Sequence, residues 1–184
     1  GTLPPGRLGN TEVWNGSAWY EVNDLNTARR QFDGSASGPS SATLAFGGET
    51  STVVAATNTE LWNGSIWTEQ NDLNIGRNAM GGAGVSTSAL GFGGNTQPDT
   101  AATEEWNADF AYGVWATSGS LNTARRDLAG TSSGTTTASL VFGGQDSTSP
   151  TPTKFANNEL YNGSVWAGQS DLNTARYQLG GAGT

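Results

Sequence analysis

The amino-acid sequence predicts an all-β fold in which a four-stranded antiparallel unit is repeated along the chain. Several sequence markers recur with a period near 48 residues, as they do in repeat architectures. The segments between these markers have the composition of short strands and tight turns. No segment carries an apolar stripe with helical spacing, so we expect little helix.

Three markers define the repeat. The motif Leu-Asn followed by Arg occurs at 25–29, 73–77, 121–125 and 172–176, with spacings of 48, 48 and 51 residues. A Trp recurs with the same spacings, at Trp19, Trp67, Trp115 and Trp166. The motif Phe-Gly-Gly begins at Phe46, Phe92 and Phe142. Agreement between independent markers excludes chance.

Within a period, the segment that ends in Phe-Gly-Gly predicts a strand. In TLAFGG, ALGFGG and SLVFGG, large and small residues alternate up to Phe, and two glycines then end the run. A strand that stops at a tight bend has this pattern.

The segment ELWNGSIW at 60–67 predicts the next two strands as a hairpin. Asn-Gly is the strongest short hairpin signal, because a two-residue type I′ turn needs positive φ at both positions. With Asn63-Gly64 as that turn, Trp62 lies opposite Ser65. Both Trp of the hairpin then point to one face, and Leu61 and Ile66 point to the other. A sheet that is apolar on both faces must be covered on both sides.

Four short strands in roughly 50 residues, covered on both faces, describe one blade of a β-propeller. The repeat resembles the kelch family, whose blades have an Arg before the first strand, an apolar run ending in Gly-Gly, an acidic-aromatic strand and then a Trp. In the first complete repeat these residues are Arg29, Phe46-Gly47-Gly48, Glu60-Leu61-Trp62 and Trp67. The gap from the aromatic residue to the Trp is shorter than is usual in the family, and only Tyr161 keeps the usual Tyr. The resemblance implies a kelch-type β-propeller, and the motifs are similar to kelch-like arrays in phage structural proteins and environmental bacterial surface proteins.

The phase of the repeat places three complete blades between two partial ones. The complete blades are predicted at 25–72, 73–120 and 121–171. Residues 1–24 hold the third and fourth strands of a blade, and 172–184 hold the first strand of a further or closing blade. Joining the two ends gives a blade without its Phe-Gly-Gly strand. We therefore expect the open edges to be completed by another polypeptide or by sequence not present here, because exposed strand edges favour aggregation.

The composition excludes several classes of function. The chain has no Cys and no His, which removes thiolate chemistry, the usual proton shuttle and the commonest metal ligand. A copper oxidase of the kelch fold, whose metal needs His and a Cys-linked Tyr, is therefore excluded. A net charge of −8 without a Lys/Arg cluster argues against nucleic acid and anionic lipid as partners. There is no apolar run long enough to insert into a membrane. We expect no catalytic residue, no metal site and no cofactor, and hence no enzyme.

The four repeat arginines, Arg29, Arg77, Arg125 and Arg176, have two interpretations. A ring of them could bind an anionic sugar. Alternatively, each forms an Arg–Asp pair or a backbone clamp that ties adjacent blades, since an Asp precedes the Arg by five residues in three of the repeats. The second interpretation is favoured, because a residue fixed by the repeat serves the repeat. The four repeat tryptophans are predicted to be buried between blades.

Binding is expected in the connections that differ between repeats, because loops on a rigid scaffold commonly carry binding residues. The connection 145–158 is the longest of its kind and contains Lys154 and Phe155, which we expect to contact a receptor. The hairpin loop 107–114 is longer than its counterparts and adds Phe110 and Tyr112, which we expect to make an assembly contact. Successive antiparallel connections alternate ends of a blade, so the two loops should lie on opposite faces.

The first hypothesis on function is a non-enzymatic, exposed structural and binding propeller, such as a virion tail or fibre protein or a cell-surface module. Its partners would be a receptor, a glycan, other subunits of an assembly or further repeats of the same array. Its neutral polar surface, with 13% charged residues against roughly 25% in an ordinary domain, favours an extracellular or virion location. The alternative is a cytoplasmic kelch adaptor that docks a peptide. A propeller enzyme, an oxidase or glycosidase, comes third.

Overall fold

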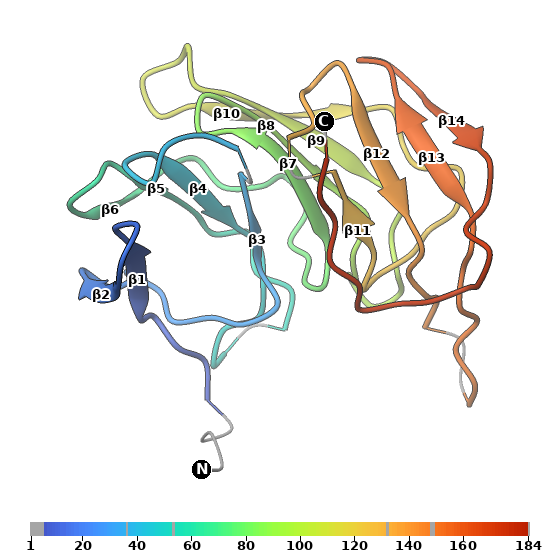
Figure 1. The fold of residues 1–184 in the computed structure, drawn as a ribbon, viewed down its shortest axis with the longest axis horizontal. Coiled ribbons are helices and arrows are strands. Elements are labelled where there is room, and N and C mark those ends of the chain that lie inside the picture. Colours follow the sequence, from blue (N-terminus) through green and yellow to red (C-terminus); the bar gives the residue numbers. More distant parts are fainter. Residues whose placement is uncertain (1–5, 36, 53, 132, 148–149, 184) are drawn as a thin grey trace.

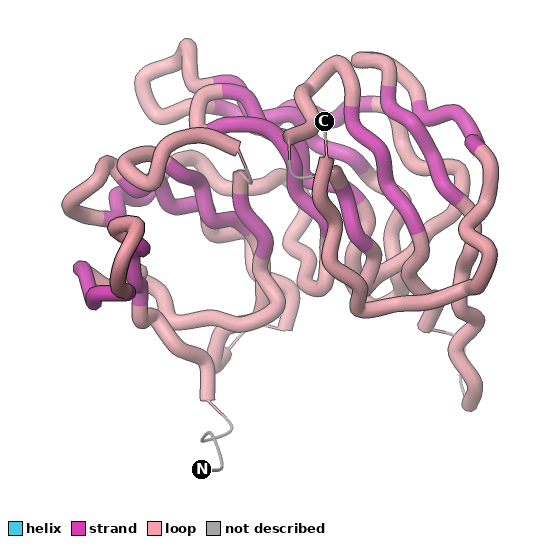
Figure 2. The backbone as a smooth tube through the Cα atoms, in the orientation of Figure 1, coloured by secondary structure: helices cyan, strands magenta, loops and turns pink. Residues whose placement is uncertain are grey.

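The chain is an all-β propeller of four-stranded antiparallel blades, as the sequence predicts. The computed structural model describes residues 6–35, 37–52, 54–131, 133–147 and 150–183. Every regular element among them is a strand (Figure 2), so none of the described residues forms a helix that could cross a membrane. The sheets follow one another around an arc that starts at the N-terminal strand pair and ends at the last blade (Figure 1).

Three sheets have four strands and one has two, and each connects its strands in sequence order. The two-stranded sheet consists of β1 (Thr11–Trp14) and β2 (Trp19–Val22). The next blade contains β3 (Asp33–Gly34), β4 (Thr43–Phe46), β5 (Thr59–Trp62) and β6 (Trp67–Glu69). The following blade contains β7 (Gly81–Val85), β8 (Ser88–Phe92), β9 (Thr103–Asn107) and β10 (Val114–Ser118). The last blade contains β11 (Ala129–Gly130), β12 (Ser139–Phe142), β13 (Asn158–Tyr161) and β14 (Trp166–Gln169).

The Asn-Gly turn exists, but its predicted length is wrong. Trp62 pairs with Trp67 rather than with the intervening residues, so the loop between them has four residues, 63–66. The side-chain oxygen of Asn63 accepts hydrogen bonds from the backbone N–H groups of Ser65 and Ile66, each at 3.0 Å. This side-chain acceptor replaces the tighter backbone turn. The two Trp share a face as predicted, with ring centroids 5.5 Å apart, whereas Ile66 lies exposed in the turn.

Each blade packs on the next through a Phe and a Trp. Phe46 on β4 meets Trp115 of the following blade edge-on, with ring centroids 4.9 Å apart, and Phe92 on β8 meets Trp166 at 5.2 Å. The indole N–H of Trp115 donates to Thr59 Oγ1 of the preceding blade at 3.0 Å. Edge-to-face aromatic pairs add stability beyond the area that they bury. The apolar core therefore lies between blades rather than within one.

The prediction that all four repeat tryptophans are buried is wrong for Trp19. Trp115 and Trp166 are buried and Trp67 is half-buried, but Trp19 is 64% exposed. The reason is positional. In the three later repeats a blade or strand pair precedes the Trp and covers it, whereas no blade precedes β1 and β2 among the described residues.

Near the propeller axis, Gln31, Ala79, Asp127 and Gln178 of successive repeats are joined by a series of backbone hydrogen bonds, here called the backbone ladder. Ala79 N donates to Gln31 O, Asp127 N to Ala79 O and Gln178 N to Asp127 O, at 2.8–2.9 Å. All four residues have positive φ, between 50° and 54°, which is uncommon for residues other than Gly. The ladder holds this strained conformation at the same position in every repeat.

Candidate functional site

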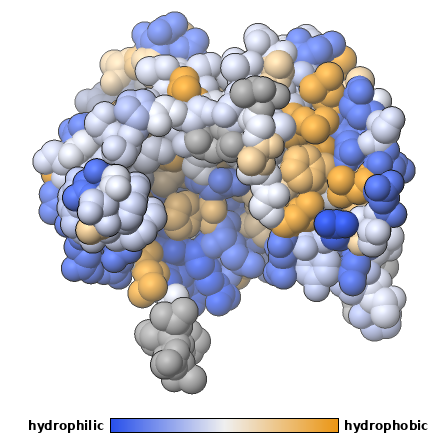
Figure 3. Space-filling model, viewed as in Figure 1, coloured by the Kyte–Doolittle hydropathy of each residue, from blue (hydrophilic) through white to orange (hydrophobic). Residues whose placement is uncertain are grey.

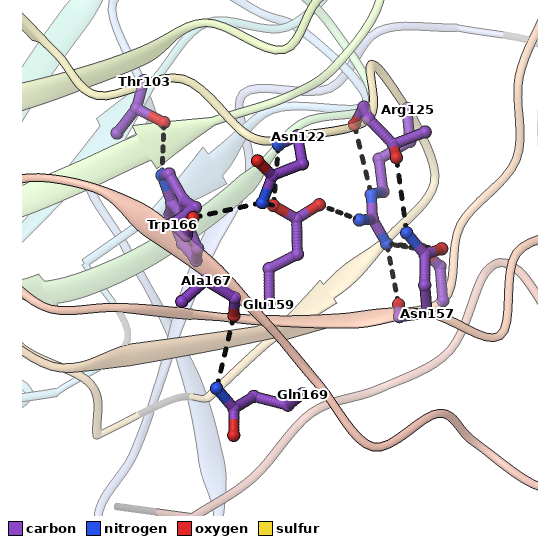
Figure 4. A network of polar contacts seen from close by, with 10 residues as sticks. Thr103, Asn122, Arg125, Asn157, Glu159, Trp166, Ala167 and Gln169 are labelled. Carbon is purple, nitrogen blue, oxygen red and sulfur yellow. Dashed lines mark hydrogen bonds and ion pairs between the residues drawn. The ribbon is translucent and has the colours of Figure 1, made fainter.

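The repeat arginines are clamps between blades. The backbone N–H of Arg125 donates to Thr100 O of the preceding blade, while its guanidinium donates to Gly143 O at 3.1 Å and to Asn157 O at 2.8 Å in the blade that follows. The same guanidinium forms an ion pair with Glu159 on β13 (Figure 4). Glu159 also accepts the backbone and side-chain N–H groups of Asn122, each at 2.7 Å.

The predicted Asp partner is wrong. The buried ion pairs join Arg29 to Glu60, Arg77 to Glu104 and Arg125 to Glu159. Asp72 instead accepts hydrogen bonds from the Thr57 hydroxyl, in the loop before β5, and from the backbone N–H of Thr59 at the start of β5. Burial lowers the pKa of each of these arginines, and the neighbouring carboxylate opposes that shift. Side chains with 0% exposure cannot contact a ligand, so these three arginines do not form a sugar-binding ring.

Arg176 is the exception among the four. It occupies the same repeat position, and its backbone N–H donates to Phe155 O as the others do to their preceding blades. Its side chain is exposed and, among the described residues, forms no ion pair. Among the described residues, no further blade supplies a glutamate to it.

The connection 145–158 does not present a free aromatic platform. Residues 148 and 149 lie outside the described residues. Phe155 is half-buried, and the guanidinium carbon of Arg125 lies 5.7 Å from its ring centroid. Its backbone N–H donates to Gly144 O, so the chain is fixed at this point. Lys154 is exposed, with its Nζ 5.3 Å from the ring centroid of Tyr177. A receptor contact through Phe155 therefore has little support.

The hairpin between β9 and β10 presents exposed aromatic side chains. Phe110 is 58% exposed and Tyr112 is 65% exposed. This hairpin projects from one end of the blade, and the connection that follows β12 projects from the opposite end (Figure 1), as predicted.

The hairpin is held in place despite its exposure. Asn71 of the preceding blade donates its backbone N–H to Tyr112 O at 3.1 Å and its side-chain N–H to Gly113 O at 2.8 Å. Gly113 has φ +61° and lies on the Trp106 ring, where an added Cβ would approach the ring to 2.0 Å. Only Gly fits such a close approach at positive φ. The loop backbone that carries Phe110 and Tyr112 is therefore fixed to the neighbouring blade.

A groove of about 600 Å³ runs beside this hairpin. Its lining includes the exposed Phe110 and the buried Trp106 together with the polar residues Glu105, Asn107 and Asp109. Neither Lys nor Arg lines it. The groove therefore combines an aromatic surface with neutral and anionic hydrogen-bonding groups.

Two further polar regions lie near the axis. A pocket of about 390 Å³ surrounds the backbone ladder, and within it Gln145 Nε2 donates to Asp127 Oδ2 at 2.9 Å. On the inner strand β3, burial raises the pKa of Asp33 to about 6, although the backbone N–H groups of Gly34 and Gly82 oppose the shift. Sequence reasoning missed both, because the axial positions are Gln, Ala and Asp with no common residue type. In the part of the chain that the structure describes, no three acidic, His or Cys side chains gather as metal ligands would.

Comparison with known proteins supports the fold alone. No protein-family model matches the chain, and no curated protein matches it in sequence. Among solved structures, the one titled "Structure of YjhT", a β-propeller-type protein, superposes with a TM-score of 0.75 at 9% identity. The match covers 93% of this chain and 64% of the other, so this chain spans less than two thirds of the protein it resembles.

Proposed function

We propose that this chain is a non-enzymatic binding propeller of kelch type and that its ligand is a neutral glycan held in the groove beside Phe110. The observation that carries the proposal is the exposed ring of Phe110, which lines the groove on a hairpin that is anchored to the neighbouring blade. An exposed aromatic ring is an apolar contact surface, and a rigid ring loses little entropy on binding.

The lining of the groove fits the chemistry of a sugar. A pyranose has an apolar C–H face, which packs on an exposed aromatic ring such as that of Phe110, and a rim of hydroxyl groups. Asn107 and Asp109 offer amide and carboxylate oxygens that accept hydrogen bonds from hydroxyl groups, while Glu105 Oε1 already accepts from Ser118 and Tyr161. Carboxylates without a nearby cation would repel a sialylated or uronic sugar, which favours a neutral one.

We further propose that the protein acts in an exposed location, on a virion or a cell surface. The support is a surface with few charges, a protein without His or Cys, and the resemblance of its motifs to phage and bacterial surface arrays. The rival proposal is a cytoplasmic adaptor that docks a peptide on one face of the ring. A peptide ligand would need backbone and side-chain partners near the axis, where Gln145 and Asp127 already bond one another.

The test is direct binding of a panel of neutral, sialylated and uronic oligosaccharides, measured by calorimetry. We expect binding of a neutral oligosaccharide, and Phe110→Ala and Asp109→Ala should each weaken it by about tenfold. Replacing residues 107–114 by the Asn-Gly-Ser-Ile turn of 63–66 should abolish it while the fold is kept. Tyr20→Ala, an exposed aromatic on β2 away from the groove, is the matched control and should bind as the unaltered protein does.

Binding that survives the shortened hairpin would place the ligand elsewhere. Binding of a peptide and of no sugar in the panel would favour the adaptor.

A further inference from the structure

The repeat changes at three positions where the middle blade, β7–β10, meets the last blade, β11–β14. Each change replaces a residue that the neighbouring repeats share: Glu105 replaces the Leu of positions 61 and 160, Ser118 replaces the Gln of positions 70 and 169, and Tyr161 replaces the Trp of positions 62 and 106. A residue that every repeat shares serves the repeat. Three departures that meet at one place therefore point to a different role.

The face on which Glu105 stands is apolar in the last blade. No further blade covers that face among the described residues, so Leu160 on β13 is 40% exposed, and Figure 3 shows apolar side chains gathered around β12 and β13. In the middle blade, Leu90 is paired with Glu105 across the sheet and is buried in a core that it shares with Tyr161. No Lys or Arg of the described residues forms an ion pair with Glu105. A carboxylate in such a place needs other partners.

Two hydroxyl groups, one from each blade, supply these partners. Ser118 Oγ donates to Glu105 Oε1 at 2.7 Å, and the Tyr161 hydroxyl donates to the same oxygen. Tyr161 is 1% exposed, and its ring centroid lies 4.9 Å from that of Trp166. Burial, and after it the hydrogen bond to Glu105, raises the pKa of Tyr161 to about 12, so the hydroxyl keeps its proton at neutral pH. The last blade thus fixes the orientation of a carboxylate on the middle blade.

The second carboxylate oxygen of Glu105, Oε2, remains available. It forms no hydrogen bond with the described residues, and it is not one of the buried atoms that lack a partner, so solvent reaches it. Glu105 lines the groove of about 600 Å³ together with Phe110 and with Thr136 of the last blade. The groove therefore contains an oriented anionic acceptor beside an exposed aromatic ring.

We propose that Glu105 is the specificity-determining residue of the groove and that Tyr161 and Ser118 are its positioning residues. This inference rests on the proposed glycan site. The sugar whose C–H face packs on Phe110 donates one of its hydroxyl groups to Glu105 Oε2. A hydrogen bond to a carboxylate is stronger than one between neutral groups, and a carboxylate that loses its water without gaining a donor is costly. The groove thus selects a neutral sugar with a free hydroxyl at that position and rejects one that is deoxygenated or O-methylated there.

Glu105→Gln tests the direction of this hydrogen bond. Only the amide oxygen of Gln can accept from Ser118 and Tyr161, so its NH₂ group is turned toward the groove, and a donor replaces an acceptor of the same shape. The probes are the tightest-binding neutral oligosaccharide of the panel described above and its monodeoxy derivatives, measured by calorimetry. E105Q should bind the parent sugar about tenfold more weakly than the unaltered protein does. One monodeoxy derivative should bind the unaltered protein about tenfold more weakly than the parent, and E105Q should discriminate against it by about threefold or less.

Tyr161→Phe tests the positioning role, because it removes the hydroxyl and keeps the ring beside Trp166. It should weaken binding of the parent sugar about threefold in the unaltered protein and have no further effect in E105Q. A merely structural role for Tyr161 would weaken binding equally in both backgrounds. Ser118→Ala acts on the same oxygen and replaces this variant if Tyr161→Phe does not fold. Glu21→Gln and Tyr20→Phe, at exposed positions of β2, are the matched controls and should bind as the unaltered protein does.

The outcomes separate this inference from the proposed function. If Phe110→Ala weakens binding but E105Q binds the parent and every monodeoxy derivative as the unaltered protein does, the role of Glu105 is overturned and the glycan site stands. Equal effects of Tyr161→Phe in the two backgrounds overturn the positioning role. If no oligosaccharide of the panel binds, or if Phe110→Ala leaves binding unchanged, the glycan site and this inference are both wrong.

Discussion

Arg77 illustrates how one residue can join two blades. Its side chain is fully buried, donates to Ala102 O at 2.6 Å and to Gly93 O at 3.3 Å, and forms an ion pair with Glu104. Removing a charge from water costs several kcal/mol unless partners compensate it, and here carbonyls and a carboxylate do so. The sequence indicates that this Arg is structural but not which acid it meets. The Arg-to-Glu separations are 31, 27 and 34 residues, because variable loops intervene, whereas the misleading Asp keeps a constant distance.

Arg125→Ala should lower the free energy of unfolding by about 3–5 kcal/mol, because it leaves Glu159 buried without its cation. Arg176→Ala, the same substitution at the exposed repeat position, should change it by less than about 0.5 kcal/mol. Urea unfolding measures both. If Arg125→Ala fails to fold, Asn122→Ala removes one side-chain donor to Glu159 and its bond to Trp166 O, and it should give a smaller loss. Equal effects at positions 125 and 176 would show that the clamp adds no stability.

The hairpin loops are stabilised by an Asn side chain that accepts hydrogen bonds from the loop backbone. Asn15, Asn63 and Asn162 each accept two backbone N–H bonds within a four-residue loop, at 2.9–3.1 Å. The Asn-Gly pair predicts that a turn exists and where it lies. It does not give the register, because the side-chain carbonyl and the backbone compete as acceptors and the sequence does not show which wins. The strands ending in Phe-Gly-Gly, by contrast, follow from alternation and two glycines.

Asn63→Ala should therefore lower the free energy of unfolding by about 1 kcal/mol, because the N–H groups of Ser65 and Ile66 lose their acceptor and must bond to water instead. Asn63→Asp keeps the acceptor oxygen and should be close to neutral. Chemical unfolding distinguishes the two variants. Equal losses in both would mean that the amide nitrogen, and not the oxygen, holds the turn.

At the scale of the whole molecule, the sequence predicts the propeller but not the contacts that its blades make near the axis. The repeat period and covered sheets are sufficient to predict a propeller. The backbone ladder through Gln31, Ala79, Asp127 and Gln178 could not be foreseen, because positive φ at a non-Gly residue is imposed by neighbouring blades. The exposure of Trp19 and of the last blade's apolar face likewise depends on whether an adjacent blade covers them. The local sequence does not determine this.

Asp33 on β3 makes stability depend on pH. Burial raises its pKa from 3.8 in the unfolded chain to about 6, so the folded protein binds the extra proton between these values. Stability from this group is therefore full below pH 3.8 and is lost as pH rises through 6. Asp33→Asn should match the unaltered protein near pH 4 and exceed it above pH 6 by up to about 2 kcal/mol, allowing for partial exposure. Thermal unfolding across pH 4–8 measures the difference, and a constant gap at every pH would contradict it.

The locked asparagine side chains also bear on how this protein ages. In an Asn-Gly pair the glycine nitrogen can attack the asparagine side-chain carbonyl, which leads to deamidation and, through isoaspartate, to a lengthened backbone. At Asn15, Asn63 and Asn162 that carbonyl oxygen is held by two backbone N–H groups, which restricts rotation of the side chain toward the attacking nitrogen. The same bonds that shape the hairpins thus protect the most labile dipeptides of the chain, and a hairpin that opens becomes chemically short-lived.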